Sequence, residues 1–172
     1  MKVKTLKNKL PEKFYNTLEF EELRPSQSKA IKAGLLVGEN IVVCSPTASG
    51  KTFVAELAGI KRIIEEGGKM IYIVPLKSLA SEKVDEFKEK YEDLGIKTAL
   101  SIGDPDASEG WLAKYDIIVC TSEKFDSLLR HKIPWLREVK TVVVDEIHLL
   151  NDFRRGPVLE VILTLIKKLI PK

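Results

Sequence analysis

The sequence predicts an α/β domain built on a mainly parallel β-sheet with helices on its faces. Two observations predict this fold. Short apolar runs alternate with helical patterns along the chain. The runs are apolar throughout rather than alternating with polar residues, as expected for parallel strands that are buried on both faces. With 172 residues, 44% of them hydrophobic and 31% charged, the chain suits a single globular domain, residues 1–172.

We expect these apolar runs to form the strands, and residues such as Pro75 show where a strand ends. Met70 to Val74 is apolar without interruption and stops at Pro75, which cannot donate to a sheet ladder. The run from Ile117 to Cys120 has the same character. The sequence predicts strands over residues 41–45, 70–74, 98–102, 117–120 and 141–144.

Helices are expected between the strands, where apolar residues recur with the 3.6-residue period. Pro25 suits the first turn of a helix, because its missing N–H has no helical partner there. Gly67 and Gly68 end the second helix, and Pro157 opens a last helix that is apolar nearly all round. The predicted helices cover residues 26–36, 51–66, 78–93, 122–130 and 157–169, and the lysine-rich residues 1–20 are expected to form an N-terminal arm.

Composition excludes several classes of protein. No apolar run approaches the roughly 20 residues that span a bilayer, and the charged N-terminus has no apolar stretch of a signal peptide after it. We therefore expect a cytoplasmic protein with no membrane partner. Cys44 and Cys120 end apolar runs without metal-ligand spacing, which predicts buried free thiols. The net charge of +3 permits nucleic-acid binding without requiring it.

The segment from Ser45 to Thr52 is typical of a phosphate-binding loop. It lies between an expected strand and an expected helix, so backbone N–H groups and the positive helix end would face one anion. Gly50 lets the backbone approach a phosphate, Lys51 would reach the β- and γ-phosphates, and the Thr52 hydroxyl would bind magnesium. The usual pattern begins with glycine, whereas the first position here is serine, and an ordinary strand-to-helix turn is the alternative. The predicted nucleotide contacts are Ser45, Pro46, Thr47, Ala48, Ser49, Gly50, Lys51 and Thr52.

Two carboxylates, Asp145 and Glu146, directly follow the apolar run 141–144. Ligands of parallel α/β sheets bind beyond the carboxyl ends of the strands, so these groups are expected near the phosphate loop. Phosphoryl transfer to water needs a metal ion and a group that orients the water. Asp145 suits the metal, together with Thr52, and Glu146 suits the water. An exposed strand end is the alternative. The predicted catalytic residues are Lys51, Asp145 and Glu146.

The ordered motifs resemble those of DExH-box superfamily-two helicases. Asp145-Glu146-Ile147-His148 is similar to their DExH box, and residues 45–52 are similar to their phosphate loop, in which Ser or Ala replaces the first Gly. The wording of these motifs, together with residues 149–152 and 155–156 after the box, is most similar to archaeal Hjm-type DNA repair helicases. This resemblance implies a RecA-like fold, ATP and Mg²⁺ as cofactors, and ATP-dependent unwinding of DNA of the repair or replication-fork type.

The same resemblance implies further site residues. Leu23 to Gln27 looks like the segment whose glutamine reads adenine, and the Gln27 amide can both donate and accept. His148 is implied to couple the nucleotide site to a later motif rather than to bind metal. Three further segments resemble motifs that hold the phosphates of a nucleic-acid strand without reading its sequence. They imply contacts by Pro75, Lys77, Ser78, Gly103, Asp104, Thr121, Ser122 and Lys124.

The resemblance covers only the first of two motor domains. The Ser-Ala-Thr motif and the second RecA-like domain, which carries the arginine fingers, do not occur in these 172 residues. Because an arginine finger contributes about 10³ to 10⁵ in rate, we expect the isolated domain to be nearly inactive. In this fold family the missing strand usually lies between strands 41–45 and 141–146. We therefore expect an incomplete sheet with marginal stability or self-association.

The expected partner is single-stranded or forked DNA. An RNA helicase of the same branch and a non-catalytic nucleic-acid-binding fragment are the alternatives that the sequence leaves open. A P-loop kinase or GTPase is disfavoured, because no acceptor-substrate or guanine-reading motif occurs in the chain.

Overall fold

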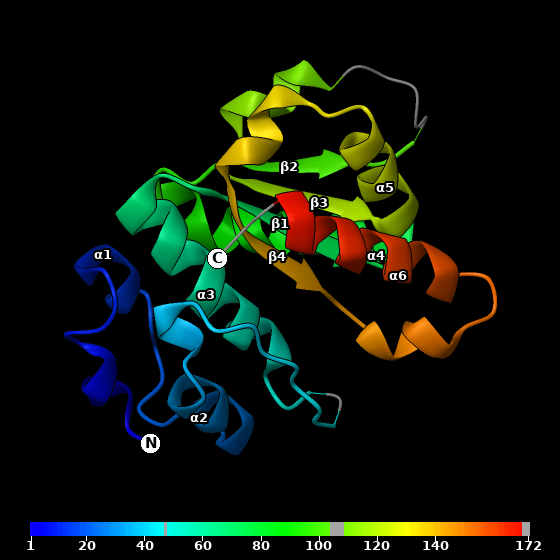
Figure 1. Cartoon of the computed structure of the whole chain (residues 1–172). Coiled ribbons are helices and arrows are strands. Elements are labelled where there is room, and N and C mark those ends of the chain that lie inside the picture. The colour runs from blue at the N-terminus through cyan, green and yellow to red at the C-terminus, as the bar shows by residue number, and fades with distance from the viewer. Residues whose placement is uncertain (47, 104–108, 170–172) are drawn as a thin grey trace. The chain divides into compact units, whose positions relative to one another are not determined.

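The computed structural model describes residues 1–46, 48–103 and 109–169. The chain forms two compact units, residues 1–67 and residues 68–172, and each unit is described by itself. The N-terminal unit is helical, and the C-terminal unit holds the β-sheet (Figure 1). Among the described residues, no helix combines the length and apolar character needed to cross a bilayer.

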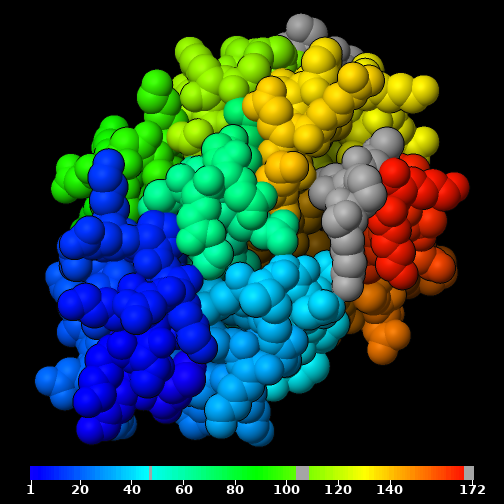
Figure 2. Space-filling model, turned by 60° about the vertical axis from the view of Figure 1, so that its left-hand side comes forward, coloured from blue at the N-terminus to red at the C-terminus, as the bar shows by residue number. Residues whose placement is uncertain are grey.

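The N-terminal unit contains α1 (Glu12–Tyr15), α2 (Pro25–Lys32) and α3 (Lys51–Glu66). The expected N-terminal arm is instead packed. A 3-10 helix over Val3–Leu6 and α1 bury apolar side chains, and the atoms of residues 1–20 form a compact dark-blue group (Figure 2). Its buried residues are Val3, Leu6, Leu10 and Phe14. Helix α3 has the predicted bounds, and Gly67 ends it in the left-handed conformation that favours glycine.

The predicted strand over residues 41–45 is wrong. These residues form neither helix nor strand, Val42 is 72% exposed, and the Cys44 thiol, expected to be buried, is exposed. An apolar run becomes a strand only when another backbone satisfies its N–H and C=O groups. No strand among the described residues pairs with this run. By contrast, Cys120 is a buried free thiol, as predicted.

The C-terminal unit is built on a parallel four-stranded sheet in the order β2-β3-β1-β4. The strands are β1 (Lys69–Val74), β2 (Thr98–Ser101), β3 (Ile117–Thr121) and β4 (Val139–Val144). Ile71 of β1 pairs with Ile118 on one side and Val142 on the other. Every residue of β1 and β3 is buried, as expected for strands covered on both faces. The predicted α/β fold with a mainly parallel sheet is therefore confirmed.

Helices cover both faces of this sheet. α5 (Ser122–Arg130) and α6 (Gly156–Leu169) pack on one face, where Phe125, Leu128 and Ile162 contact the core made by Ile71 and Ile118. α4 (Lys77–Tyr91) packs on the other face, where the Phe87 ring meets the Tyr72 ring edge to face at 5.3 Å. Because the strands are parallel, their carboxyl ends share one edge of the sheet, and the segments with the expected nucleic-acid contacts and the acidic pair leave from that edge (Figure 1).

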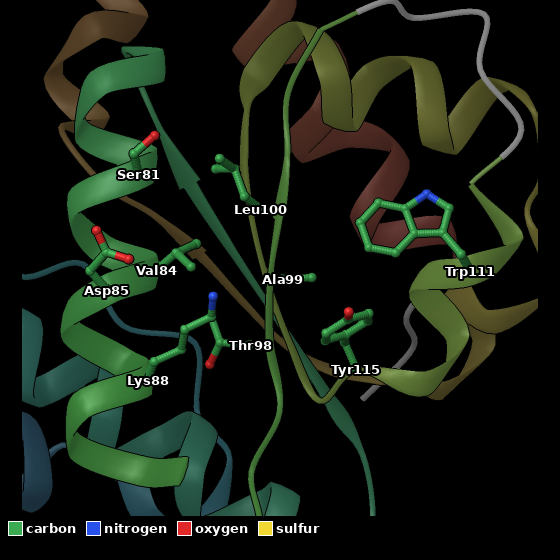
Figure 3. A pocket seen from close by; sticks show the side chains of 9 residues that line it. All are labelled: Ser81, Val84, Asp85, Lys88, Thr98, Ala99, Leu100, Trp111 and Tyr115. Atoms are coloured by element: carbon green, nitrogen blue, oxygen red, sulfur yellow. The ribbon is translucent and has the colours of Figure 1, made fainter.

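A cavity of about 280 Å³ lies beside the edge strand β2. Figure 3 shows side chains of α4 on one side of the strand and Trp111 and Tyr115 on the other. Thr98 lines this cavity, and its buried hydroxyl has no hydrogen-bond partner among the described residues. None of the predicted site residues lines it. The predicted site residues therefore lie outside this cavity, some in the phosphate loop of the N-terminal unit and others at the sheet edge of the C-terminal unit.

Candidate functional site

The phosphate loop ends at Gly50, the N-cap of α3, where the backbone is left-handed with φ of 81°. A Cβ on Gly50 would also lie 2.4 Å from the Gln27 amide nitrogen. The backbone conformation therefore favours glycine here, and a larger residue would displace the Gln27 amide. Ala48, two residues earlier, also has a positive φ of 60°, so the loop turns sharply before the helix begins.

Three side chains at the start of α2 hold three successive carbonyls of this loop, those of residues 48–50. The Arg24 guanidinium donates to the first carbonyl, Ser26 Oγ to the second at 3.2 Å, and Gln27 Nε2 to the third at 3.2 Å. Gln27 Oε1 accepts from the Arg24 backbone N–H at 2.8 Å. The Gln27 side chain, expected to read adenine, thus also joins the start of α2 to the loop. Adenine reading by Gln27 stays a prediction.

Lys51 lies over the loop that precedes it. Its Nζ donates to the carbonyl of Ser45 at 2.8 Å and to that of Pro46 at 3.2 Å. The hydroxyls of Ser45 and Ser49 lie 2.6 Å apart. Serine at the first loop position therefore adds a hydrogen bond across the loop that glycine could not make. Thr47 lies outside the described residues.

The acidic pair is placed by the end of β4. The backbone N–H of Asp145 donates to the carbonyl of Ile73 at 2.9 Å, which extends the pairing of β4 with β1. The Tyr72 hydroxyl donates to Asp145 Oδ2 at 3.2 Å and orients that carboxylate. Glu146 follows with a positive φ of 54°, and its carboxylate lies 3.1 Å from His148 Nδ1. The Asp145 carboxylate also accepts from the Glu146 backbone N–H at 2.9 Å, so the two acidic residues are linked through the backbone and Glu146 is linked to His148 through its side chain.

The donors expected to bind Mg²⁺ have suitable chemistry. The Asp145 carboxylate and the Thr52 hydroxyl offer hard oxygen atoms, which Mg²⁺ prefers, and Mg²⁺ usually keeps several waters and binds substrate phosphates. Among the described residues no group of three or more His, Cys, Asp or Glu side chains could hold a metal by itself.

The predicted nucleic-acid contacts fall into two groups. Lys77 and Ser78 are exposed in the first turn of α4, just after Pro75, and Gly103 is exposed after β2. Thr121 and Ser122 are buried at the junction of β3 and α5. There the Thr121 hydroxyl caps α5 by accepting from the N–H three residues on. Asp104 lies outside the described residues.

The structure places Lys124 differently from what the sequence led us to expect. Its side chain is 2% exposed, and its Nζ lies 2.7 Å from the carboxylate of Glu109. A lysine near the end of a strand was expected to face a nucleic-acid phosphate. Its ammonium group is instead neutralised inside the unit by Glu109, which leaves it unavailable to a phosphate in this structure.

Sequence reasoning missed residues that support the site from outside the motifs. Tyr72 had a signal, because it is the one polar side chain within the apolar run of β1. Arg24 and Ser26 lie in the segment around Gln27, but nothing in the sequence showed that they bind the phosphate loop. Glu109 had no signal, because its partner is distant in sequence and a single glutamate in a connecting segment is usually exposed.

Comparisons with known proteins agree with this geometry. Residues 24–172 match the family model for the DEAD/DEAH box helicase. The chain is 56% identical over 144 residues to the ATP-dependent DNA helicase Hel308 of Pyrococcus abyssi, covering 84% of this chain and 20% of that protein. It is 52% identical over 160 residues to Hel308 of Methanococcus vannielii, covering 90% of this chain and 21% of that protein. The chain therefore spans about a fifth of the length of these relatives.

Solved structures show the same fold. A crystal structure of the DUF1998 helicase MrfA has a TM-score of 0.77 and 28% identity, covering 91% of this chain and 26% of that one. A structure of MrfA bound to DNA and AMPPNP has a TM-score of 0.71 and 27% identity, covering 81% of this chain and 21% of that one.

Proposed function

The chain belongs to the DEAD/DEAH box helicase family, and from this we propose that it is the ATP-binding first motor domain of an ATP-dependent DNA helicase. The phosphate loop carries the proposal. Its residues turn at Gly50 into the N-terminus of α3, with Lys51 over the loop and three α2 side chains holding the loop carbonyls. The relatives in two archaea are named ATP-dependent DNA helicases, which supports this assignment.

Each residue of the nucleotide site has a proposed role. Backbone N–H groups of the loop and the start of α3 bind phosphate oxygens, and Lys51 exchanges its loop carbonyls for the β- and γ-phosphates. Asp145 and Thr52 would hold Mg²⁺, which offsets negative charge on the phosphate oxygens when it is bound. Glu146 orients the attacking water, with His148 Nδ1 3.1 Å from its carboxylate. Gln27 reads adenine.

The proposed nucleic-acid surface lies at the carboxyl edge of the sheet. Lys77 and Ser78 at the start of α4, Gly103 after β2 and the N-terminal turn of α5 bind phosphates of one strand. Such contacts position a strand without reading its bases. They suit DNA and RNA alike, so RNA stays an alternative. We propose DNA because the named relatives act on DNA.

Equilibrium binding of a fluorescent ATP analogue with Mg²⁺ tests the nucleotide site. We expect binding by the unmodified chain and its loss in Lys51→Ala. Lys61→Ala is the matched control, because Lys61 lies on the same helix but pairs with Glu65. Unchanged binding in Lys51→Ala, or equal losses in both variants, would contradict the proposal.

Competition between a single DNA strand and an RNA strand of matched sequence separates the two helicase alternatives. Tighter binding of DNA supports the DNA helicase, and tighter binding of RNA supports the RNA helicase. Strand binding without any nucleotide binding would instead indicate a non-catalytic nucleic-acid-binding module.

A further inference from the structure

Glu109 joins three elements of the C-terminal unit from inside it. Its Oε1 lies 2.7 Å from Lys124 Nζ, and its Oε2 accepts a short hydrogen bond from Ser101 Oγ. Its backbone carbonyl accepts from the Trp135 indole N–H at 3.1 Å. The side chains of Lys124 and Glu109 are only 2% and 7% exposed. A buried carboxylate whose partners are all in place holds the elements that carry them in one arrangement.

The two side chains that bind the Glu109 carboxylate, those of Ser101 and Lys124, each lie beside a proposed nucleic-acid contact. Ser101 is the last residue of β2, two residues before Gly103. Lys124 is in the first turn of α5, whose N-cap is Thr121. Ser101 is paired with Cys120 of β3, so the carboxylate also lies near the end of that strand, where burial and the charge of Glu109 raise the pKa of the Cys120 thiol. One buried carboxylate thus connects the ends of two strands at the same edge of the sheet.

We propose that the Glu109–Lys124 ion pair is a positioning device for strand binding. It holds Gly103 and the N-terminal turn of α5 so that their backbone N–H groups meet phosphates of the same strand. Lys124 therefore acts through its ion pair and is not itself a phosphate ligand. This inference rests on the proposed function, because it assigns how the nucleic-acid surface keeps its shape.

Two physical arguments favour positioning over direct contact. Turning Lys124 outward to a phosphate would leave the Glu109 carboxylate buried without its cation, and breaking a buried ion pair is strongly unfavourable. The N-terminus of α5 also needs no lysine to attract a phosphate, because the positive end of the helix dipole already favours an anion there.

A mutant cycle on the full chain tests the proposal, with affinity for a fluorescein-labelled single DNA strand measured by anisotropy at several salt concentrations. We expect Glu109→Gln and Lys124→Met each to weaken binding by about tenfold or more, because each leaves one buried group without its partner. The double variant carries no buried charge, so it should recover most of the lost affinity. The slope of log affinity against log salt should stay unchanged throughout.

Direct phosphate contact by Lys124 predicts a different pattern. Lys124→Met and the double variant would then be equally weak, and Glu109→Gln would bind normally or better. The salt slope would fall by about 0.7 in both variants that lack Lys124, as expected for one lost contact to a single strand. This pattern of affinities, or this fall in the salt slope, would overturn the positioning role.

Lys69→Met is the matched control. Lys69 is also buried and ion-paired, with Glu138 at 3.2 Å, but it lies at the amino end of β1, away from the proposed surface. Its loss should leave strand affinity unchanged. A loss equal to that in Lys124→Met would mean that any weakened core reduces binding.

Amide hydrogen exchange provides a readout that needs no DNA. In Glu109→Gln we expect faster exchange at Gly103 and residues 122–124, with unchanged exchange in the middle of α4. If the unmodified chain binds no strand, the proposed function fails, while this pattern still decides whether Glu109 orders the two segments. Uniform acceleration over the whole unit, or none at these residues, would overturn the inference.

Discussion

Replacing Gly50 with alanine tests how α2 and the phosphate loop depend on each other. An added Cβ would lie 2.4 Å from Gln27 Nε2, and the backbone there has φ of 81°. The Gln27 carboxamide would have to move. It would then give up its bond to the Gly50 carbonyl at 3.2 Å and its bond from the Arg24 N–H at 2.8 Å.

The expected size of the effect follows from these two terms. A left-handed conformation costs a residue with a Cβ about 1–2 kcal/mol. Two lost hydrogen bonds add about 2 kcal/mol, at roughly 1 kcal/mol each. We therefore expect Gly50→Ala to lower the free energy of unfolding of the N-terminal unit by about 3–4 kcal/mol. Binding of an ATP analogue should weaken as well, because the loop carbonyls are no longer held.

Gly67 at the other end of α3 is the matched control. Its φ is also positive, at 65°, but no atom lies within 4 Å of the Cβ that alanine would add. Gly67→Ala should cost only the conformational term, about 1–2 kcal/mol. Urea unfolding measures both variants, and Gln27→Ala in the Gly50→Ala background should be less harmful than the sum of the two changes. Equal losses in the two glycine variants, or strict additivity, would refute the reasoning.

Three further predictions concern the C-terminal unit. A Cβ on Gly156 would lie 2.3 Å from the Leu150 carbonyl oxygen. Gly156→Ala should therefore lower the free energy of unfolding, measured by thermal unfolding, by about 1–3 kcal/mol. Gly110→Ala is the control and should have little effect, because the space around Gly110 is open. Backbone N–H groups two and three residues on lower the pKa of Asp152; its stabilising effect is therefore present above the unfolded value of about 3.9 and lost as pH falls through the folded pKa. The stability gap between Asp152→Ala and the unmodified chain should accordingly close in acid, and a gap that is constant with pH would contradict this. Among the described residues β4 has a strand partner on one side only, so we expect association at micromolar concentration, and a stable monomer in sedimentation would show otherwise.

The sequence predicted most elements of the fold because their signals are local. The bounds of α3 and α5 agree with the structure, as do the buried strands β1 and β3 to within one residue. The strand over residues 41–45 could not be judged locally. Its apolar run shows only that these residues are able to form a strand. Whether they do depends on a neighbouring strand that the rest of the chain must supply.

The candidate site likewise has parts that local sequence predicts and parts that depend on distant residues. The phosphate loop and the acidic pair lie in short motifs; the loop leads into α3 and the acidic pair follows β4, as expected, although the strand expected before the loop is absent from the described residues. The contacts that hold them are distant in sequence. Lys124 shows the difficulty, because a lysine can be buried only where an anion meets it, and its partner Glu109 lies fifteen residues earlier.

In the C-terminal unit, β1 contacts the acidic pair proposed for nucleotide hydrolysis and also leads into the surface proposed for strand binding. Ile73 pairs with the backbone of Asp145, and Tyr72 orients its carboxylate. The same strand ends at Val74, directly before Pro75 and the exposed start of α4 that we propose as a phosphate contact. Because tightly packed cores transmit small displacements, a shift of β1 moves the carboxylate and the start of α4 together. A core substitution in β1 that leaves the fold intact should therefore affect nucleotide binding and strand binding jointly, whereas one in β2 should affect strand binding alone.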